Sequence, residues 1–198
     1  MNYKIAYFLL VLLLTSNTFA NEFDVFINSF KSYEADFKQK VFSENGSLKQ
    51  ITEGEMSLMR PSLFLWHTKK PYEQILLINN NDIWLYDVDL DQVTKQNKVS
   101  LNDTPLYWFI KNNKNLNTKK AKFSYNKDNL NWYQTFQKND KFEKILFAFK
   151  EGMLMKIKLV YKLGFIIIEL DNIKANKNIN LNKFKLNLSN DVDIIYQK

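Results

Sequence analysis

The chain has 198 residues, a formal net charge of +7 and no cysteine. This length suits one ordinary domain with a sizeable core. The lack of cysteine excludes disulfides, a thiolate nucleophile and lipidation of a cysteine after export. Because the 28 Lys and Arg residues are scattered among asparagines rather than stacked in a block, we interpret the positive charge as a solvated surface and expect no nucleic acid as a partner.

Residues 1–20 have the pattern of a secretory signal peptide. Lys4 is the only charged residue in this segment, an apolar run follows at 6–14, and Thr18-Phe19-Ala20 is a small-x-Ala cleavage signal. The apolar run is too short for a transmembrane helix, so an uncleaved anchor is the less favoured alternative. We expect residues 21–198 to be exported as a single domain. An exported chain without cysteine fits a bacterial periplasm better than an extracellular disulfide scaffold.

The N-terminal part of the exported chain predicts a helix and then strands. Within residues 22–33 the apolar side chains recur at i, i+3, i+4 and i+7, the spacing of an amphipathic helix: Phe23, Phe26, Ile27 and Phe30. From Glu34 the period changes to two, which is typical of a strand. Asn45-Gly46 is a strong hairpin signal, and the next strand is predicted at 48–59.

The middle of the chain predicts more strands and a second helix. Alternation and turn signals predict three strands, at 63–68, 73–78 and 83–86. The polar stretch at 87–101 favours a long loop with a short strand at 92–95. Asp103-Thr104-Pro105 is a helix start, with a capping side chain followed by proline. The helix that follows is apolar nearly all round, so it must be covered on most sides.

The C-terminal part predicts strands joined by short turns. They are expected at 121–126, 131–137, 142–150, 153–161 and 165–173, with a final strand through Phe184, Leu186 and Leu188. Short connections of this kind indicate an antiparallel meander. About ten or eleven strands with two short helices predict a mainly β fold, in which the sheet curls into a barrel or half-barrel.

One arginine interrupts the alternation. Met56, Leu58, Phe64 and Trp66 all have the same parity, and Arg60 shares it. A buried guanidinium stays charged and needs several hydrogen-bond acceptors or an escape to water. Pro61 follows directly, and proline in a strand pattern marks an edge, a break or a bulge. Parity is therefore uncertain beyond Pro61, and Leu63 and Leu65 remain alternatives to Phe64 and Trp66 as inward-facing residues.

The residues that would support catalysis or metal binding are sparse. His67 is the only histidine and has no partner at catalytic spacing, which favours a structural role. Asp87, Asp89 and Asp91 alternate as in a calcium loop, but the glycine and closing glutamate of such a loop are absent. We therefore expect no enzyme, no metal and no cofactor. The aromatic residues, 15% of the chain, instead leave two options: the helices plug the sheet, or they cover a cavity for an apolar ligand.

Four motifs together resemble one family, in order and spacing across residues 30–110. They are Tyr33-x-Ala35-x-Phe37-x-Gln39, Gly54-x5-Arg60-Pro61-x2-Phe64-x-Trp66, Ile83-Trp84-x-Tyr86 and Thr104-Pro105. In these motifs the chain is similar to the periplasmic outer-membrane lipoprotein carriers, the LolA family.

The resemblance implies a fold and a function. The expected fold is an unclosed antiparallel barrel of about eleven strands, with short helices forming a lid over a hydrophobic cavity. The expected function is that of a periplasmic chaperone, not an enzyme, which shields the acyl chains of lipoproteins released from the inner membrane and delivers them to an outer-membrane receptor. The implied partners are acylated lipoproteins, an ATP-driven inner-membrane exporter and an outer-membrane receptor, and we expect a monomer.

The resemblance also implies roles for individual residues. Arg60 matches the arginine that bonds to the lid helices and holds the empty state closed, so we name it the lid latch. The candidate cavity and lid residues are Leu58, Phe64, Trp66, Trp84, Phe109 and Ile110.

Two other functions stay open from the residues alone. A related half-barrel that carries or senses another envelope amphiphile, such as a glycolipid or a mislocalised lipoprotein, would have the same apolar residues. An envelope hydrolase would need a nucleophile and a base, and His67 offers thin support for that pair.

Overall fold

A computed structural model of the protein describes residues 21–79, 82–97, 106–110, 121–135, 141–189 and 191–197. The elements in chain order are α1 (Glu22–Ser29), β1 (Ser32–Ser43), β2 (Leu48–Met59), β3 (Leu63–Lys70), β4 (Gln74–Asn79), β5 (Asp82–Asp87), β6 (Gln92–Asn97), α2 (Leu106–Ile110), β7 (Ala121–Lys127), β8 (Leu130–Thr135), β9 (Lys144–Lys150), β10 (Met153–Tyr161), β11 (Gly164–Ala175), the 3₁₀ helix η4 (Leu181–Phe184) and β12 (Asp193–Gln197).

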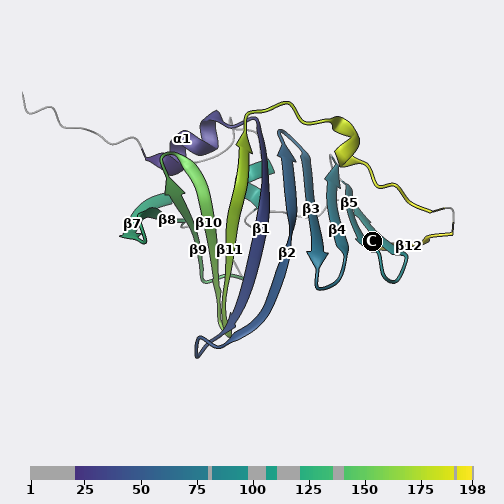
Figure 1. Ribbon diagram of the computed structural model, residues 1–198, viewed down its shortest axis with the longest axis horizontal. Helices are drawn as coiled ribbons and strands as arrows, with labels where there is room; N and C mark the ends of the chain where they lie inside the picture. Colours follow the sequence, from purple (N-terminus) through teal and green to yellow (C-terminus); the bar gives the residue numbers. More distant parts are fainter. Residues whose placement is uncertain are drawn as a thin grey trace, which may run out of the picture.

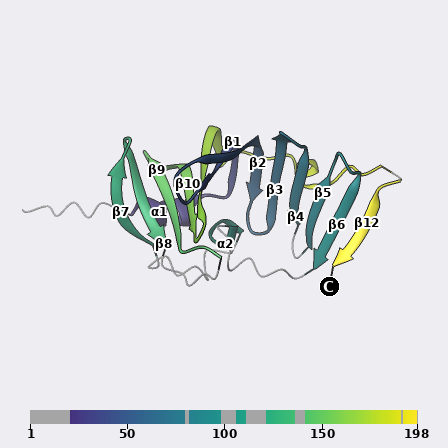
Figure 2. The same ribbon diagram turned by 90° about the horizontal axis from the view of Figure 1, so that it is seen from below.

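Within the described residues the strands form one sheet of 12, in the order β12-β6-β5-β4-β3-β2-β1-β11-β10-β9-β8-β7. Neighbouring strands are antiparallel except β12, which pairs parallel with β6. The sheet is unclosed, with β7 and β12 at its two edges (Figure 1). Seen from below, the sheet is curved and α2 lies on its inner side (Figure 2). The predicted open antiparallel architecture is thus confirmed, with one strand more than the eleven expected.

Helix α1 forms and docks for local reasons. Asn21 caps it, because its side chain accepts a hydrogen bond from the backbone N–H of Phe23 at 3.1 Å. Phe23, Phe26 and Ile27 are its buried residues. The Phe23 ring lies 5.2 Å from that of Phe147 on β9, centroid to centroid. The helix stops at Ser29, four residues before the expected end, and β1 begins at Ser32.

The sheet has two differently occupied faces. The inner face, defined as the one that contacts α1 and α2, holds the large apolar cluster in which both helices take part. The outer face holds two smaller clusters, one around Leu130 and Trp132 and one around Leu65 and Phe184. Side chains of successive residues alternate between the faces, as Trp132 and Tyr133 do on β8.

The C-terminal segment departs from the prediction. The strand expected through Phe184, Leu186 and Leu188 is wrong, since η4 covers 181–184 and the last strand is β12. Phe184 is 1% exposed and packs on the outer face against β3 and β4, so the apolar alternation there serves packing rather than strand pairing. The short strand expected at 92–95 is confirmed as β6.

Three predictions fall on residues that the structure does not describe. They are the signal peptide at 1–20, the helix start at Asp103-Thr104-Pro105 and the last two residues of the strand expected at 131–137. Within the described ranges, no helix has both the length and the apolar character to cross a membrane.

Candidate functional site

Arg60 connects the turn after β2 to both helices. Its Nη1 donates to the carbonyl of Ile27 on α1 at 2.5 Å. Its Nε and Nη2 donate to the carbonyls of Phe109 and Trp108 on α2, at 2.9 and 3.0 Å. One side chain therefore joins two helices that are about 80 residues apart in the sequence.

The acceptors are carbonyls from the last turns of the two helices. The last four carbonyls of an α-helix have no partner within the helix and need one from outside. Ile27 lies in the last turn of α1, and Trp108 and Phe109 lie in the last turn of α2. A cation at a helix C-terminus is also favoured by the partial negative charge there. Arg60 thus caps the C-terminal ends of both helices at once.

The guanidinium is largely removed from water. Its Cζ lies 3.8 Å from the centroid of the Phe30 ring, a cation–π contact. Burial lowers the pKa of Arg60 to about 10, which leaves the side chain charged at neutral pH. Its backbone is fixed as well, because the N–H of Arg60 donates to the carbonyl of Lys31 at 2.9 Å. The guanidinium charge is therefore stabilised by main-chain carbonyls and by the Phe30 ring.

The strand register resolves the parity question around Pro61. Leu58 lies opposite Phe64 and Met56 lies opposite Trp66 in the β2–β3 pair. Phe64 and Trp66 hence return to the inner face, where they join the cluster under the helices. The alternative residues, Leu63 and Leu65, pack on the outer face instead.

The fold brings most of the predicted cavity and lid residues together. The inner cluster includes Leu58, Phe64, Phe109 and Ile110, which are 1%, 2%, 4% and 7% exposed, with Trp66 packed at its margin. Trp84 is the exception, and the prediction that it faces the cavity is wrong. It lies opposite Leu77 in the β4–β5 pair and packs on the outer face near Phe184. The Ile-Trp-x-Tyr motif contributes Ile83, not Trp84, to the inner cluster.

The space between the helices and the sheet is filled by aromatic side chains. The ring of Phe23 lies 5.2 Å from that of Trp108, and the ring of Phe109 lies 5.7 Å from that of Phe147. Phe26 and Phe149 pack at 5.4 Å. Of the two options left by the sequence, this structure therefore shows the helices as a plug.

An open pocket lies on the inner face beyond the plug. It has a volume of about 610 Å³, and Trp66 and Leu76 form part of its wall. Trp66 stacks on Phe37 with 3.7 Å between ring centroids, and Phe37 belongs to the inner cluster. Sequence reasoning missed this pocket. The sequence did contain a sign of it. Gln39, Thr52 and Thr68 occupy positions with the same parity as the inward apolar residues, but they are polar.

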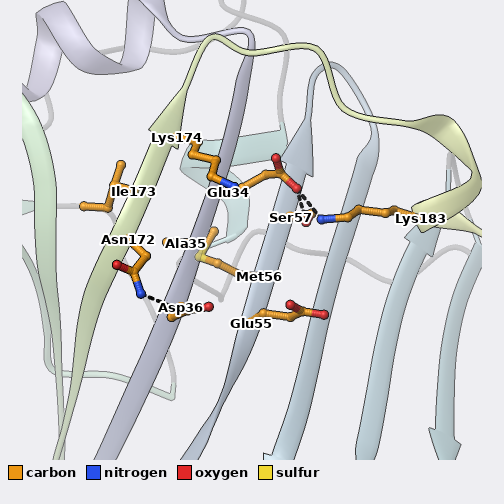
Figure 3. A pocket seen from close by; sticks show the side chains of 10 residues that line it. All are labelled: Glu34, Ala35, Asp36, Glu55, Met56, Ser57, Asn172, Ile173, Lys174 and Lys183. Atoms are coloured by element: carbon orange, nitrogen blue, oxygen red, sulfur yellow. Dashed lines mark hydrogen bonds and ion pairs between the residues drawn. The ribbon is translucent and has the colours of Figure 1, made fainter.

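The outer face also has a hollow, but it is polar and bridged by paired groups. Figure 3 shows Glu34 directed toward Ser57 and Lys183. The Glu34 carboxylate accepts from the Ser57 hydroxyl at 3.2 Å and pairs with the Lys183 ammonium of η4. Asn172 donates to Asp36 in the same hollow. The Glu34–Lys183 pair attaches η4 to the sheet, and the Asn172–Asp36 bond joins β11 to β1.

His67 and Asp91, considered for catalysis and for calcium, both have structural partners. His67 Nε2 lies 2.7 Å from a carboxylate oxygen of Glu73, and Nδ1 lies 3.5 Å from one of Glu55. Asp91 accepts hydrogen bonds from the hydroxyls of Tyr86 and Ser189, at 2.8 and 2.9 Å. In the part of the chain that the structure describes, no group of three His, Cys, Asp or Glu side chains is placed to hold a metal ion.

Comparisons with known proteins give partial sequence matches and a fold match. The chain is 46% identical over 70 residues to an outer-membrane lipoprotein carrier protein of Pseudomonas paraeruginosa, which covers 35% of this chain and 34% of that protein. It is 40% identical over 90 residues to the protein of that description from Wigglesworthia glossinidia brevipalpis, covering 45% and 44%. The alignments thus span less than half the length of these relatives.

A solved structure supports the fold alone. An uncharacterized conserved protein from Thermus thermophilus superposes with a TM-score of 0.57 at 10% identity, covering 88% of this chain and 95% of that one.

The family model described as outer membrane lipoprotein carrier protein LolA matches residues 28–187, which is most of the chain. The chain therefore belongs to the LolA family.

Proposed function

We propose that the protein is a periplasmic carrier that shields the acyl chains of lipoproteins released from the inner membrane and delivers them to an outer-membrane receptor. Its partners are acylated lipoproteins, an ATP-driven inner-membrane exporter and that receptor. Residues 1–20 direct its export as a signal peptide and are then removed. The exported chain folds as one domain and acts as a monomer, without a cofactor or a catalytic step. Family membership supports this proposal.

The observation that carries the proposal is the contact of Arg60 with both helices. An apolar plug could be held by apolar contacts alone, and a half-buried cation adds a desolvation penalty to it. Arg60 instead donates hydrogen bonds to three main-chain carbonyls, which require a defined position of both helices. These bonds break together when the helices move away from the sheet. Such a contact suits a two-state lid.

Simple energetics explain why a carrier needs such a lid. Each methylene group removed from water contributes about 0.8 kcal/mol. Two or three acyl chains therefore represent on the order of 30 kcal/mol gross, so transit through water requires a shield. The cargo must also leave again. Because binding must displace the aromatic plug and the Arg60 contacts, the net affinity is reduced and release becomes possible.

Mass spectrometry of co-purified lipids tests the proposal. The full chain would be purified without detergent from the periplasm of a bacterial host, beside Arg60→Leu and a control, Lys183→Leu, which removes a cation from the outer face. We expect acyl chains attached to the N-terminal cysteine of lipoproteins, with higher occupancy in Arg60→Leu than in the other two proteins. Co-purification of glycolipids or phospholipids alone would contradict the proposal and favour a carrier of another amphiphile.

A further inference from the structure

The inner face of the sheet changes character along its strands. At the lid end its inward residues are apolar and buried, as are Leu58, Phe64 and Ile78. At the opposite end the same parity holds amides and hydroxyls. Gln39 lies opposite Thr52 in the β1–β2 pair, and Thr68 lies opposite Gln74 in the β3–β4 pair. The face is therefore amphipathic from one end to the other.

The end opposite the lid forms the open pocket of about 610 Å³, where the apolar side chains of Leu76 and Leu85 lie beside the amides and hydroxyls. This volume is within the usual range of about 300–1,000 Å³ for a site that binds a small molecule. The turn with Pro71 and Tyr72 and the turn with Asp89 and Leu90 lie at its rim. Tyr72 and Leu90 are 73% and 70% exposed, so the rim offers apolar surface to a ligand. The pocket is present while the lid end is closed.

Among the residues that the structure describes, the pocket is lined by no positive charge, although the chain carries +7. None of the described residues that line it is Lys, Arg or His, and Asp87 and Asp89 supply carboxylates. Nearby strands place their lysines on the outer face, where Lys38 pairs with Glu53 at 2.6 Å and Lys40 pairs with Glu169 at 2.6 Å. A phosphate in the pocket would thus meet carboxylates and no cation, whereas amides and hydroxyls can bond to ester and amide groups.

Trp66 connects the two halves of the inner face. Its ring lines the pocket and also packs against the cluster under the helices. A ligand with apolar chains under the lid would therefore have its polar part beside Trp66, in the pocket. The order of environments along the strands matches the order of groups along such an amphiphile.

We propose that this pocket binds the uncharged part of the cargo, rich in amide and ester groups, and that it selects against lipids with a phosphate. The inference rests on the proposed carrier function and names a feature of its cargo. An acylated glyceryl-cysteine peptide has such a part, with two ester groups and amide bonds, whereas a phospholipid presents an anion at the same position.

A competition experiment with a charge reversal tests the inference. The probes are a triacylated cysteinyl-serine amide, which has no charge, and phosphatidylglycerol with the same acyl chains. Each would displace a fluorescent acylglycerol from the full-length exported chain. The pocket variant is Gln50→Lys with Gln74→Lys, since both side chains are exposed on the inner face. The matched control is Gln134→Lys, which lies opposite Leu146 on the outer face.

We expect the wild type and Gln134→Lys to prefer the lipopeptide to phosphatidylglycerol. In the pocket variant this preference should fall by about tenfold or more, the factor that one charge-assisted contact provides. Equal displacement by both probes in the wild type, or an unchanged preference in the pocket variant, would overturn the inference and leave the carrier function standing. Failure of the lipopeptide to bind the wild type would overturn the carrier function, and the inference with it.

Discussion

Arg60 and Phe109 are joined by a hydrogen bond of 2.9 Å, in which the guanidinium Nε donates to a carbonyl in the last turn of α2. The same guanidinium bonds to Ile27 on α1. Because these bonds end on main-chain carbonyls, they depend on where the helices lie and not on which side chains the helices present. A ligand that lifts either helix must break part of this set, so the binding of such a ligand would compete with the closed arrangement of the helices.

Gly54 is required by the close approach of its neighbours. A Cβ at this position would lie 2.0 Å from the carbonyl oxygen of His67 and 2.8 Å from the Phe37 ring. We expect Gly54→Ala to lower the free energy of unfolding by about 2–4 kcal/mol, because the sheet backbone must shift. Urea unfolding measures this, with Gln50→Ala on the same strand as a control. A change below that of the control would show that the strand adapts freely.

Trp66 and Trp84 should report differently on cargo. Trp66 lies on the inner face and Trp84 on the outer face. Addition of an acylated ligand should therefore change the tryptophan emission of Trp84→Phe as much as that of the wild type. In Trp66→Phe the change should be clearly smaller. The reverse pattern would place the ligand on the outer face and refute the site described above.

Phe184 anchors the C-terminal segment. Its side chain is 1% exposed and lies among Leu65 and Leu77. We expect Phe184→Ala to destabilise the fold by about 3–5 kcal/mol through the lost burial and the cavity left behind. Limited proteolysis should also cleave the segment around η4 faster. Leu181→Ala, at a side chain that is 58% exposed, is the control, and equal effects of the two variants would refute an anchoring role.

Glu169 should make a small, pH-dependent contribution to stability. Its burial raises the pKa of the carboxyl, but the ion pairs with Lys156 and Lys40, at 2.9 and 2.6 Å, outweigh this effect and lower the pKa from its ordinary value of 4.5. For a carboxylate whose pKa is lowered by folding, the stabilisation is present above the ordinary pKa and is lost as pH falls through the lowered value.

Glu169→Gln should therefore lower the free energy of unfolding at pH 7 by at most about 1 kcal/mol, since the pairs are partly exposed. The difference from the wild type should vanish as pH falls below 4.5. Urea unfolding at several pH values from neutral to acidic checks this, with Glu44→Gln in the exposed hairpin turn as control. A difference that stays constant with pH would contradict the assignment.

Alternation and turn chemistry were sufficient to predict most of the fold. The hairpin at Asn45-Gly46 and the strand alternation are local properties, so the order of elements follows from them. Parity also placed Leu58 and Arg60 on one face, as the structure has them. Arg60 could be singled out from the sequence because it is a cation at a position that shares a face with apolar residues.

The faces of the more distant strands could not be predicted in this way. Whether Trp84 faces inward depends on its register with β4, a pairing that the sequence of β5 does not contain. Likewise, Phe184 alternates with Leu186 as in a strand, but its packing partners, Leu65 and Leu77, are more than 100 residues away. In both cases the direction of the side chain depends on contacts with residues that are distant in the sequence. The local pattern of apolar residues contains no information on such contacts.

The role of Arg60 as a latch that favours the closed, empty state can be tested by the rate at which a fluorescent triacylated lipopeptide dissociates into excess acceptor vesicles. It would be measured for the wild type, Arg60→Leu and Lys183→Leu, each checked for an unchanged fold by circular dichroism. If Arg60 favours the closed, empty state, its loss removes contacts that are regained on release. We expect dissociation slower by about tenfold or more in Arg60→Leu, and unchanged in Lys183→Leu. A rate in Arg60→Leu equal to or faster than that of the wild type would contradict it.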